Sequence, residues 1–200
     1  MPALSRNVAD WLSEHHGVVS LSELHALGTS EWHARSLVSS GLFVPVHRDV
    51  FRIASTPESF ESRCRGACAT SPDVVLGGST SGRFWGYRRM PRQLRVIALV
   101  PPGSTPITKG VSLRRCDAVP PRDIVQRDDG IRLTSPPRTM LELAVELDDL
   151  DLESVIEQGL DQYFGPPAPW DVLRRVGGRG RPGSARLRRD SRRCVAVPRP

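Results

Sequence analysis

Three glycines divide the first 41 residues into short segments in which apolar residues recur at helical spacing. In the first segment Val8 and Leu12 lie four residues apart, and Gly17 follows. Residues three or four positions apart share one face of a helix, and glycine readily takes the left-handed conformation that closes one. The pattern predicts a first helix that ends before Gly17. Two further helices are expected to end at Gly28 and Gly41.

The second and third helices also carry signals for where they begin. Ser20 and Glu23 have the spacing of a capping box, in which each side chain bonds the backbone amide of the other residue. Thr29 or Ser30 is the expected cap of the third helix. Its apolar side is formed by Ala34, Leu37 and Val38.

After Gly41 the pattern changes to that of a β-hairpin. Residues 42–46 and 50–53 are rich in β-branched and aromatic side chains, and the polar triplet His47-Arg48-Asp49 lies between them. Three short helices followed by a hairpin is the element order of a winged helix-turn-helix, whose third helix enters the DNA major groove. We therefore expect a winged helix-turn-helix over residues 1–54.

Residues 55–170 are expected to form a second, α+β domain, because strand patterns and helix patterns are mixed without the long alternation of a doubly wound sheet. The fold class predicted for the chain is α+β. Helices are predicted at residues 58–70, 79–86, 135–147, 152–164 and 170–176, and strands at residues 73–78, 94–100, 110–115 and 131–133.

The net charge of +6 is concentrated at the end of the chain. Residues 1–55 and 56–170 each carry a net charge of −1, whereas residues 171–200 hold ten arginines against two acids. This last stretch has few apolar residues and many glycines, prolines and arginines, a composition that cannot build its own core. We expect residues 171–200 to form an arginine-rich, unstructured tail, which is either a truncated remnant or a DNA-binding arm.

Composition excludes several classes of protein. No run approaches the roughly 18 apolar residues of a membrane span, and the N-terminus lacks the order of a signal peptide, so a cytoplasmic location without a membrane partner is expected. The four cysteines, at positions 64, 68, 116 and 194, are too irregular for a disulfide framework, and Cys64 and Cys68 lack two further zinc ligands. No metal and no cofactor is predicted.

One segment resembles a phosphate-binding loop, and its alternative is purely structural. Residues 77–82 read Gly-Gly-Ser-Thr-Ser-Gly, which could hold a phosphate at the start of a helix. The segment lacks the lysine of a P-loop, and a helix cap after a strand explains it as well. We find no catalytic constellation and expect no enzyme activity.

The candidate DNA-binding residues lie on the third helix and at the hairpin tip. With Ala34 and Leu37 inward, the opposite face offers an indole, a guanidinium and hydroxyls for base edges and phosphates. The alternative is that Trp32 packs on a neighbouring domain and Arg35 is only solvated. The predicted residues are Thr29, Ser30, Trp32, His33, Arg35, Ser36, Ser39, His47 and Arg48.

Four phrases of the sequence resemble actinobacterial proteins related to AbiEi antitoxins, the regulators of type IV toxin–antitoxin systems. The phrases are Gly-Val-Val-Ser at 17–20, Val-Ser-Ser-Gly-Leu at 38–42 with Val-Phe-Arg-Ile at 50–53, Phe-Trp-Gly-Tyr at 84–87, and the longest one at 129–144, which contains Ser-Pro-Pro-Arg-Thr-Met-Leu-Glu. The resemblance implies a DNA-binding winged helix that represses its own promoter, an antitoxin function in the second part, and a symmetric or tandem arrangement on inverted repeats, such as a homodimer on DNA.

The sequence departs from this pattern at two places. The family's hairpin tip reads Arg-Gly-Val-Tyr-Arg, whereas residues 48–52 read Arg-Asp-Val-Phe-Arg, so that an acid replaces the glycine of the turn. Many relatives also continue into an endonuclease-like domain, whereas this sequence has arginine- and proline-rich residues where that domain would begin, so we expect no complete nuclease core. The favoured hypothesis is a regulator that binds double-stranded DNA. The alternatives are a protein-binding antitoxin that sequesters a nucleotidyltransferase-like toxin, and a degenerate relic of a nuclease.

Overall fold

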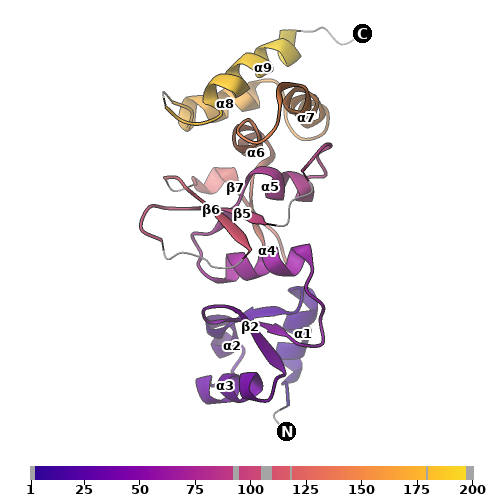
Figure 1. Cartoon of the computed structure of the whole chain (residues 1–200), viewed down its shortest axis with the longest axis vertical. Helices are drawn as coiled ribbons and strands as arrows, with labels where there is room; N and C mark the ends of the chain where they lie inside the picture. Colours follow the sequence, from indigo (N-terminus) through magenta and orange to yellow (C-terminus); the bar gives the residue numbers. More distant parts are fainter. Residues whose placement is uncertain (1–2, 92–94, 105–109, 118, 179, 197–200) are drawn as a thin grey trace. The chain divides into compact units, whose positions relative to one another are not determined.

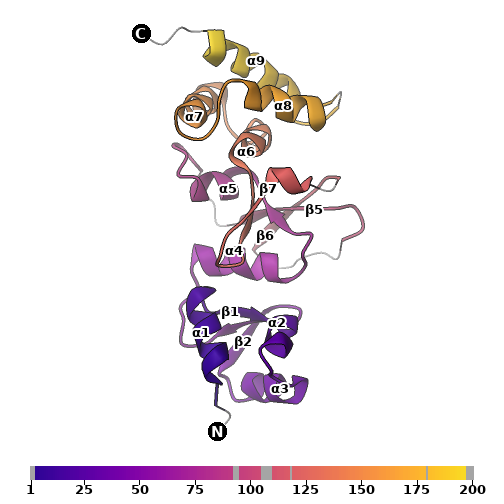
Figure 2. The same cartoon turned by 180° about the vertical axis from the view of Figure 1, so that it is seen from behind.

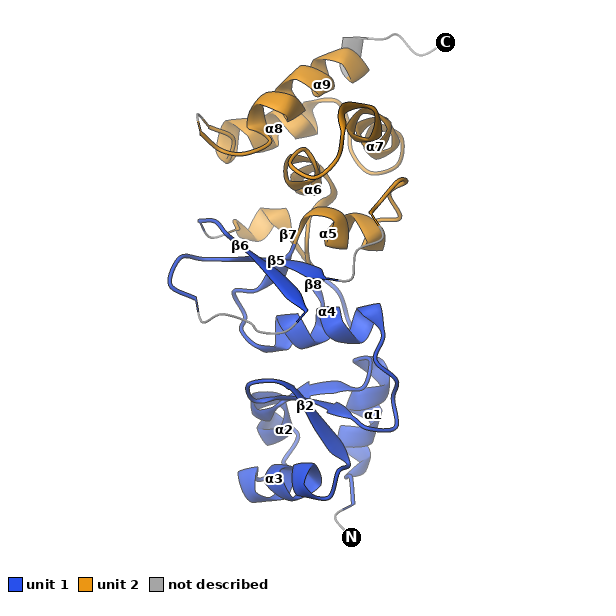
Figure 3. Ribbon diagram, viewed as in Figure 1, with its two compact units in different colours: residues 1–76, 94–118, 126–132 blue, residues 77–93, 119–125, 133–200 orange. Residues whose placement is uncertain are grey.

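A computed structural model describes residues 3–91, 95–104, 110–117, 119–178 and 180–196 of the chain. The fold combines helices with two β-sheets, and the expected α+β class is confirmed. The chain divides into two compact units, the first made of residues 1–76, 94–118 and 126–132 and the second of residues 77–93, 119–125 and 133–200 (Figure 3). This division differs from the three consecutive parts expected from the sequence, because segments distant along the chain return to the first unit.

The first unit begins with three helices and a small sheet (Figure 1). The helices are α1 (Arg6–Glu14), α2 (Leu21–Ala26) and α3 (Glu31–Ser39), and the strands are β1 (Val18–Ser20), β2 (Phe43–His47) and β3 (Val50–Ile53). The sheet is antiparallel with the order β1-β3-β2, and Val19 pairs with Phe51. Its core is apolar and is formed by Val8, Leu12, Val19, Leu24, Ala34, Leu37 and Phe43.

The signals read from the sequence explain where these helices begin and end. Ser20 and Glu23 form both bonds of a capping box at α2, and the Ser30 hydroxyl accepts a bond from the His33 amide at the start of α3. Gly17 and Gly28 follow α1 and α2 with φ angles of +73° and +83°. The three-residue strand β1 is an element that the sequence pattern does not predict.

The remainder of the first unit packs against this sheet through helix α4 (Phe60–Ala69), which contacts β1, β2 and β3. Arg65, buried in α4, forms an ion pair with Glu23 of α2, and His16 Nε2 lies 3.0 Å from Asp129 Oδ2. Strands β4 (Val75–Leu76) and β6 (Val111–Arg115) pair with the wholly buried β5 (Val96–Val100), antiparallel and parallel respectively. The second sheet has the order β6-β5-β4-β8-β7, with β7 at Ile124–Gln126 and β8 at Arg132–Thr134.

The second unit is mostly helical. It contains α5 (Gly78–Phe84), the 3-10 helix η1 (Pro121–Asp123), α6 (Pro136–Leu143), α7 (Asp149–Gln162), α8 (Pro167–Arg175) and α9 (Ser184–Ala196). Its core joins α6, α7 and α8 through Met140, Leu143, Val155 and Val172, and Leu187 of α9 belongs to it. Figures 1 and 2 show α9 lying beside α7 and α8.

A network of buried charges crosses the second unit. Arg138 and Asp123 are both 1% exposed and lie 3.6 Å apart, measured from Nη1 to Oδ2. Arg175 binds both oxygens of Asp123 at 2.8 Å, and Arg138 and Arg181 both bind Glu142. Each buried acid therefore has two guanidinium partners, which offsets the cost of removing these charges from water.

The end of the chain differs from the unstructured tail that composition predicts. Residues 171–175 belong to α8, and the structure places residues 184–196 in α9. The fully buried Leu187 anchors α9 in the core, and Arg186 and Arg189 pair with Asp149 of α7. Composition misses this helix because its partners are acids some forty residues earlier in the chain.

Candidate nucleic-acid interface

The outer face of α3 carries the side chains expected there. Ala34 and Leu37 are 1% exposed and face the core, whereas Trp32 is 77% exposed, the second highest value among the large apolar side chains of the described residues. Arg35 and Ser39 are exposed on the same outer side, and Ser36 is half-buried. Within the first unit, the indole of Trp32 is left largely uncovered.

Two interactions along α3 already occupy this face. Arg35 Nη2 lies 2.5 Å from Glu31 Oε1, one helical turn earlier, and both side chains are exposed. The Ser39 hydroxyl donates a 3.0 Å hydrogen bond to the Arg35 carbonyl oxygen. Because the ion pair cancels its charge, Arg35 must leave Glu31 or share it before it binds a phosphate or a guanine edge.

The three predicted residues at the start of α3 serve the fold. Thr29 is buried, and Ser30 accepts the bond from the His33 amide at 3.2 Å. His33 Nε2 lies 3.2 Å from the carbonyl oxygen of Ala3, which precedes α1. Only Ser30 among the three is exposed, and its hydroxyl is engaged in the cap.

The hairpin tip forms a separate group. Asp49 has a φ angle of +57°, and its carbonyl oxygen accepts a 2.8 Å bond from the Leu21 amide at the start of α2. Since β2 begins near the end of α3 and runs toward this tip, the turn lies at the opposite end of the strand from α3. The structure thus divides the predicted residues into an α3 face and a tip.

His47 and Arg48 have different surroundings at this tip. Arg48 is exposed, and its Nε lies 3.6 Å from Asp49 Oδ2. His47 is half-buried beside Gly66 of α4, and burial lowers the pKa of its imidazole. Its Nδ1 is buried without a hydrogen-bond partner among the described residues. His47 is therefore uncharged at neutral pH, and Arg48 supplies the positive charge of the tip.

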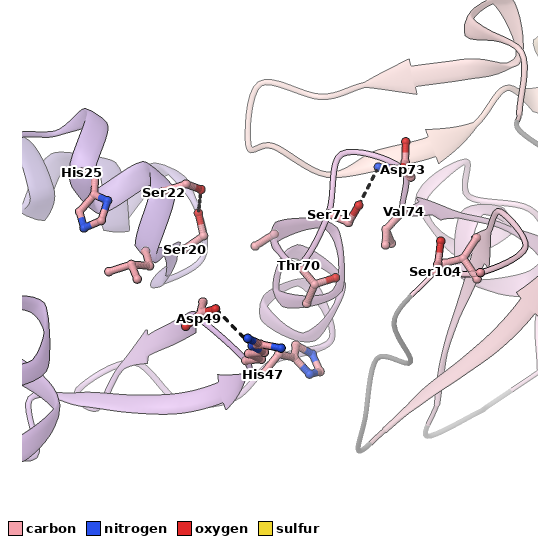
Figure 4. Close-up of a pocket in the computed structure, with 15 residues that line it drawn as sticks. Ser20, Ser22, His25, His47, Asp49, Thr70, Ser71, Asp73, Val74 and Ser104 are labelled. Carbon is pink, nitrogen blue, oxygen red and sulfur yellow. Dashed lines mark hydrogen bonds and ion pairs between the residues drawn. The ribbon is translucent and has the colours of Figure 1, made fainter. Parts of the chain in front are cut away.

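A cleft of about 740 Å³ opens beside the hairpin tip within the first unit (Figure 4). The start of α2 contributes the hydroxyls of Ser20 and Ser22, and the end of α4 contributes those of Thr70 and Ser71. Within the cleft the Arg48 guanidinium pairs with Asp49, so the wall combines opposite charges. Sequence reasoning does not find this cleft, because its walls come from four segments spread between residues 20 and 104.

The glycine-rich segment 77–82 is occupied by a side chain of the protein itself. Both carboxylate oxygens of Glu146 accept bonds from the Ser79 amide, at 3.2 and 3.1 Å, and one also binds the Ser79 hydroxyl. The carboxylate takes the place that a phosphate would need at the start of α5. The geometry favours the structural alternative for this segment.

The remaining chemistry-bearing residues are dispersed or buried. Cys64 and Cys68 are buried in α4, and burial raises the pKa of the Cys68 thiol. Within the described ranges, no three histidine, cysteine or acidic side chains are grouped so that they could hold a metal ion. The same ranges contain no helix that is both long and apolar enough to cross a membrane.

Comparisons with known proteins show a shared fold. No family model and no curated protein matches the chain. Among solved structures it is similar to the Rv2827c protein from Mycobacterium tuberculosis, with a TM-score of 0.56 and 16% sequence identity, over 93% of this chain and 76% of that one. At this identity the likeness shows a shared fold and nothing about activity.

Proposed function

We propose that the protein is a DNA-binding transcriptional regulator of the AbiEi antitoxin type, whose residues 1–54 act as a winged helix-turn-helix. The proposal rests on the α3 face, where Trp32 is 77% exposed beside the exposed Arg35. The exposed indole offers a large aromatic surface that a partner can cover. The same helix face carries a guanidinium and two serine hydroxyls. This combination suits contacts to base edges in the DNA major groove.

The element order supports the same assignment. In a winged helix-turn-helix the strand before the second helix pairs with the last strand of the hairpin, and here β1 pairs with β3. α3 is then the recognition helix, with Trp32, Arg35, Ser36 and Ser39 toward the DNA. Repression of the protein's own promoter, and binding as a homodimer on inverted repeats, follow from the resemblance to the antitoxin family.

The test is a titration of the full chain with the DNA upstream of its gene and with a scrambled duplex of equal length. We expect tighter binding to the upstream DNA, and Arg35→Ala is expected to reduce that preference by about 1–3 kcal/mol if Arg35 reads a base. Arg6→Ala is the matched control, because Arg6 is also an exposed arginine of this unit that pairs with an acid four residues away, Asp10.

If the Arg35→Ala protein binds the upstream DNA as tightly as the unaltered chain does, α3 is not the recognition helix. A protein-binding antitoxin is the second candidate, favoured by the exposure of Val145 (47%), which follows α6, and of Leu150 (79%), in the first turn of α7. That candidate leads if the chain does not distinguish the two duplexes but copurifies with the product of a neighbouring gene.

A further inference from the structure

Helix α9 carries its arginines in two rows. The inner row lies against α7, where Arg186 Nη2 is 2.6 Å from Asp149 Oδ1 and Arg189 Nη2 is 2.8 Å from Asp149 Oδ2. Arg193 continues the row with an ion pair of 2.5 Å to Glu153. Acids of the same unit neutralise these arginines. The ion pairs hold the helix in place and add little to the positive charge at the surface.

The outer row consists of Arg188 and Arg192, which lie four residues apart on α9 and are both exposed. Four residues of α-helix advance about 6 Å, so the two guanidiniums stand one turn apart on the same side. Neither forms an ion pair with any residue in the part of the chain that the structure describes. These two guanidiniums therefore present unpaired positive charge to the solvent.

A tryptophan of α8 supports one end of the outer row. Arg192 Cζ lies 5.9 Å from the centre of the Trp170 ring, a cation–π contact that restricts the arginine side chain. The acid next to this tryptophan, Asp171, is bound by Arg174 and does not neutralise Arg192. An arginine already held in position loses less conformational entropy when it binds an anion.

We propose that Arg188 and Arg192, supported by Trp170, form a second DNA contact that binds backbone phosphates without reading sequence. This inference rests on the proposed function, because it takes DNA as the polyanion. The proposed function also needs a further source of attraction to DNA phosphates. Residues 1–55 have a net charge of −1 and Arg35 is paired with Glu31, so α3 alone attracts phosphates poorly. The outer row supplies attraction that the α3 face lacks.

The test compares two double variants of the full chain in the same titrations, across a salt series. In Arg188→Gln/Arg192→Gln we expect the negative slope of log K against log salt to become shallower by about 2, because each phosphate contact contributes about 0.9 to its magnitude. We also expect affinity near 0.1 M salt to fall by roughly tenfold per arginine. The loss should be the same factor for upstream and scrambled DNA.

The matched control is Arg88→Gln/Arg122→Gln, which removes the same charge from two other exposed positions of the second unit. An unchanged slope in Arg188→Gln/Arg192→Gln, or an equal change in both double variants, would overturn the inference. The failures are separable: if upstream DNA is preferred and the outer row has no effect, only this inference falls. If the outer row governs binding but no duplex is preferred, only the proposed function falls.

Discussion

At the scale of single residues, more than half of the arginines that the structure describes pair with acids. Arg35 pairs with Glu31, Arg65 with Glu23, and Arg175 with Asp123. An exposed pair such as Arg35–Glu31 is worth little to stability, typically below about 1 kcal/mol, but it decides whether the guanidinium is available to a ligand. Counting arginines therefore overestimates the positive surface of the molecule.

Glu31 should for this reason oppose DNA binding by α3. We expect Glu31→Gln to increase affinity for the upstream duplex several-fold, because the change removes a negative charge facing the phosphates and releases Arg35. The same change should lower the free energy of unfolding by about 0.3–1 kcal/mol, since an acid in the first turn of a helix favours the helix dipole.

Fluorescence anisotropy and thermal melting measure the two effects separately. Asp10→Asn is the control, because Asp10 pairs with Arg6 on α1 in the same i, i+4 spacing. If Asp10→Asn raises affinity as much as Glu31→Gln does, the effect is one of net charge and gives no support to α3 as the reading helix.

The longest phrase of the family resemblance has a structural explanation at this scale. Its Arg138 and Glu142 belong to the buried charge network, and its Thr139 hydroxyl bonds the carbonyl oxygens of Thr134 and Ser135 at the start of α6. Breaking a buried ion pair costs more than the pair contributes. These residues therefore define the fold of the second unit, and they carry no direct evidence for an antitoxin activity.

At the scale of elements, the sequence predicts what depends on local signals. Caps and closing glycines locate α1, α2 and α3, and apolar patterns place α4, α6, α7 and the strand β5 near their observed ranges. β1 and β7, of three residues each, show no strand pattern in the sequence and are strands because a partner pairs with them. Local patterns predict the exposed face of α3. They do not predict the outer row of α9, because composition indicates an unstructured tail there.

The stability cost of replacing two helix-ending glycines tests how much these local signals contribute. Gly17 and Gly28 both have positive φ angles, but a Cβ at position 17 would lie 2.9 Å from Thr56 Cβ, whereas a Cβ at position 28 would meet no atom within 4 Å. We expect Gly28→Ala to destabilise the protein by about 1 kcal/mol through backbone strain alone, and Gly17→Ala to cost about 1–2 kcal/mol more through the clash.

Denaturant unfolding of the two variants gives this difference directly. Both substitutions introduce the same methyl group at a left-handed position, so the backbone strain is common to the two variants. The clash with Thr56 occurs only in Gly17→Ala. Equal losses would mean that Thr56 moves aside at no cost, and that the packing of the first helix against the segment before α4 is looser than the structure indicates.

At the scale of the whole molecule, charge is distributed so that the basic end of the chain folds onto acids of α7. Leu187 is the one fully buried apolar side chain of α9 among its described residues, and the hydroxyls of Ser184 and Ser191 are buried without partners there. With a single fully buried apolar anchor among its described residues, α9 also depends on the ion pairs to Asp149 and Glu153 for its docking. Such docking depends on solvent conditions.

We therefore expect α9 to separate from α7 at high salt and at acid pH while the core of the second unit remains folded. Salt near 1 M shortens the Debye length to about 3 Å and screens exposed pairs. Hydrogen bonds from Arg186 and then Arg189 lower the pKa of the Asp149 carboxyl. A depressed carboxyl pKa stabilises the folded form above its unfolded value of about 3.9, so this contribution is lost as pH falls below about 4.

Hydrogen-exchange protection factors measure this release residue by residue. Amides of residues 184–194 should lose protection between low and high salt, and again below about pH 4, while amides of α6 keep theirs. Leu187→Ala should lower the protection of α9 already at low salt, since it removes the anchor and leaves the ion pairs in place. Protection of α9 that is unchanged by salt and acid would show that its packing, and not its charge, holds the helix, and the inner arginines would then have no role in docking it.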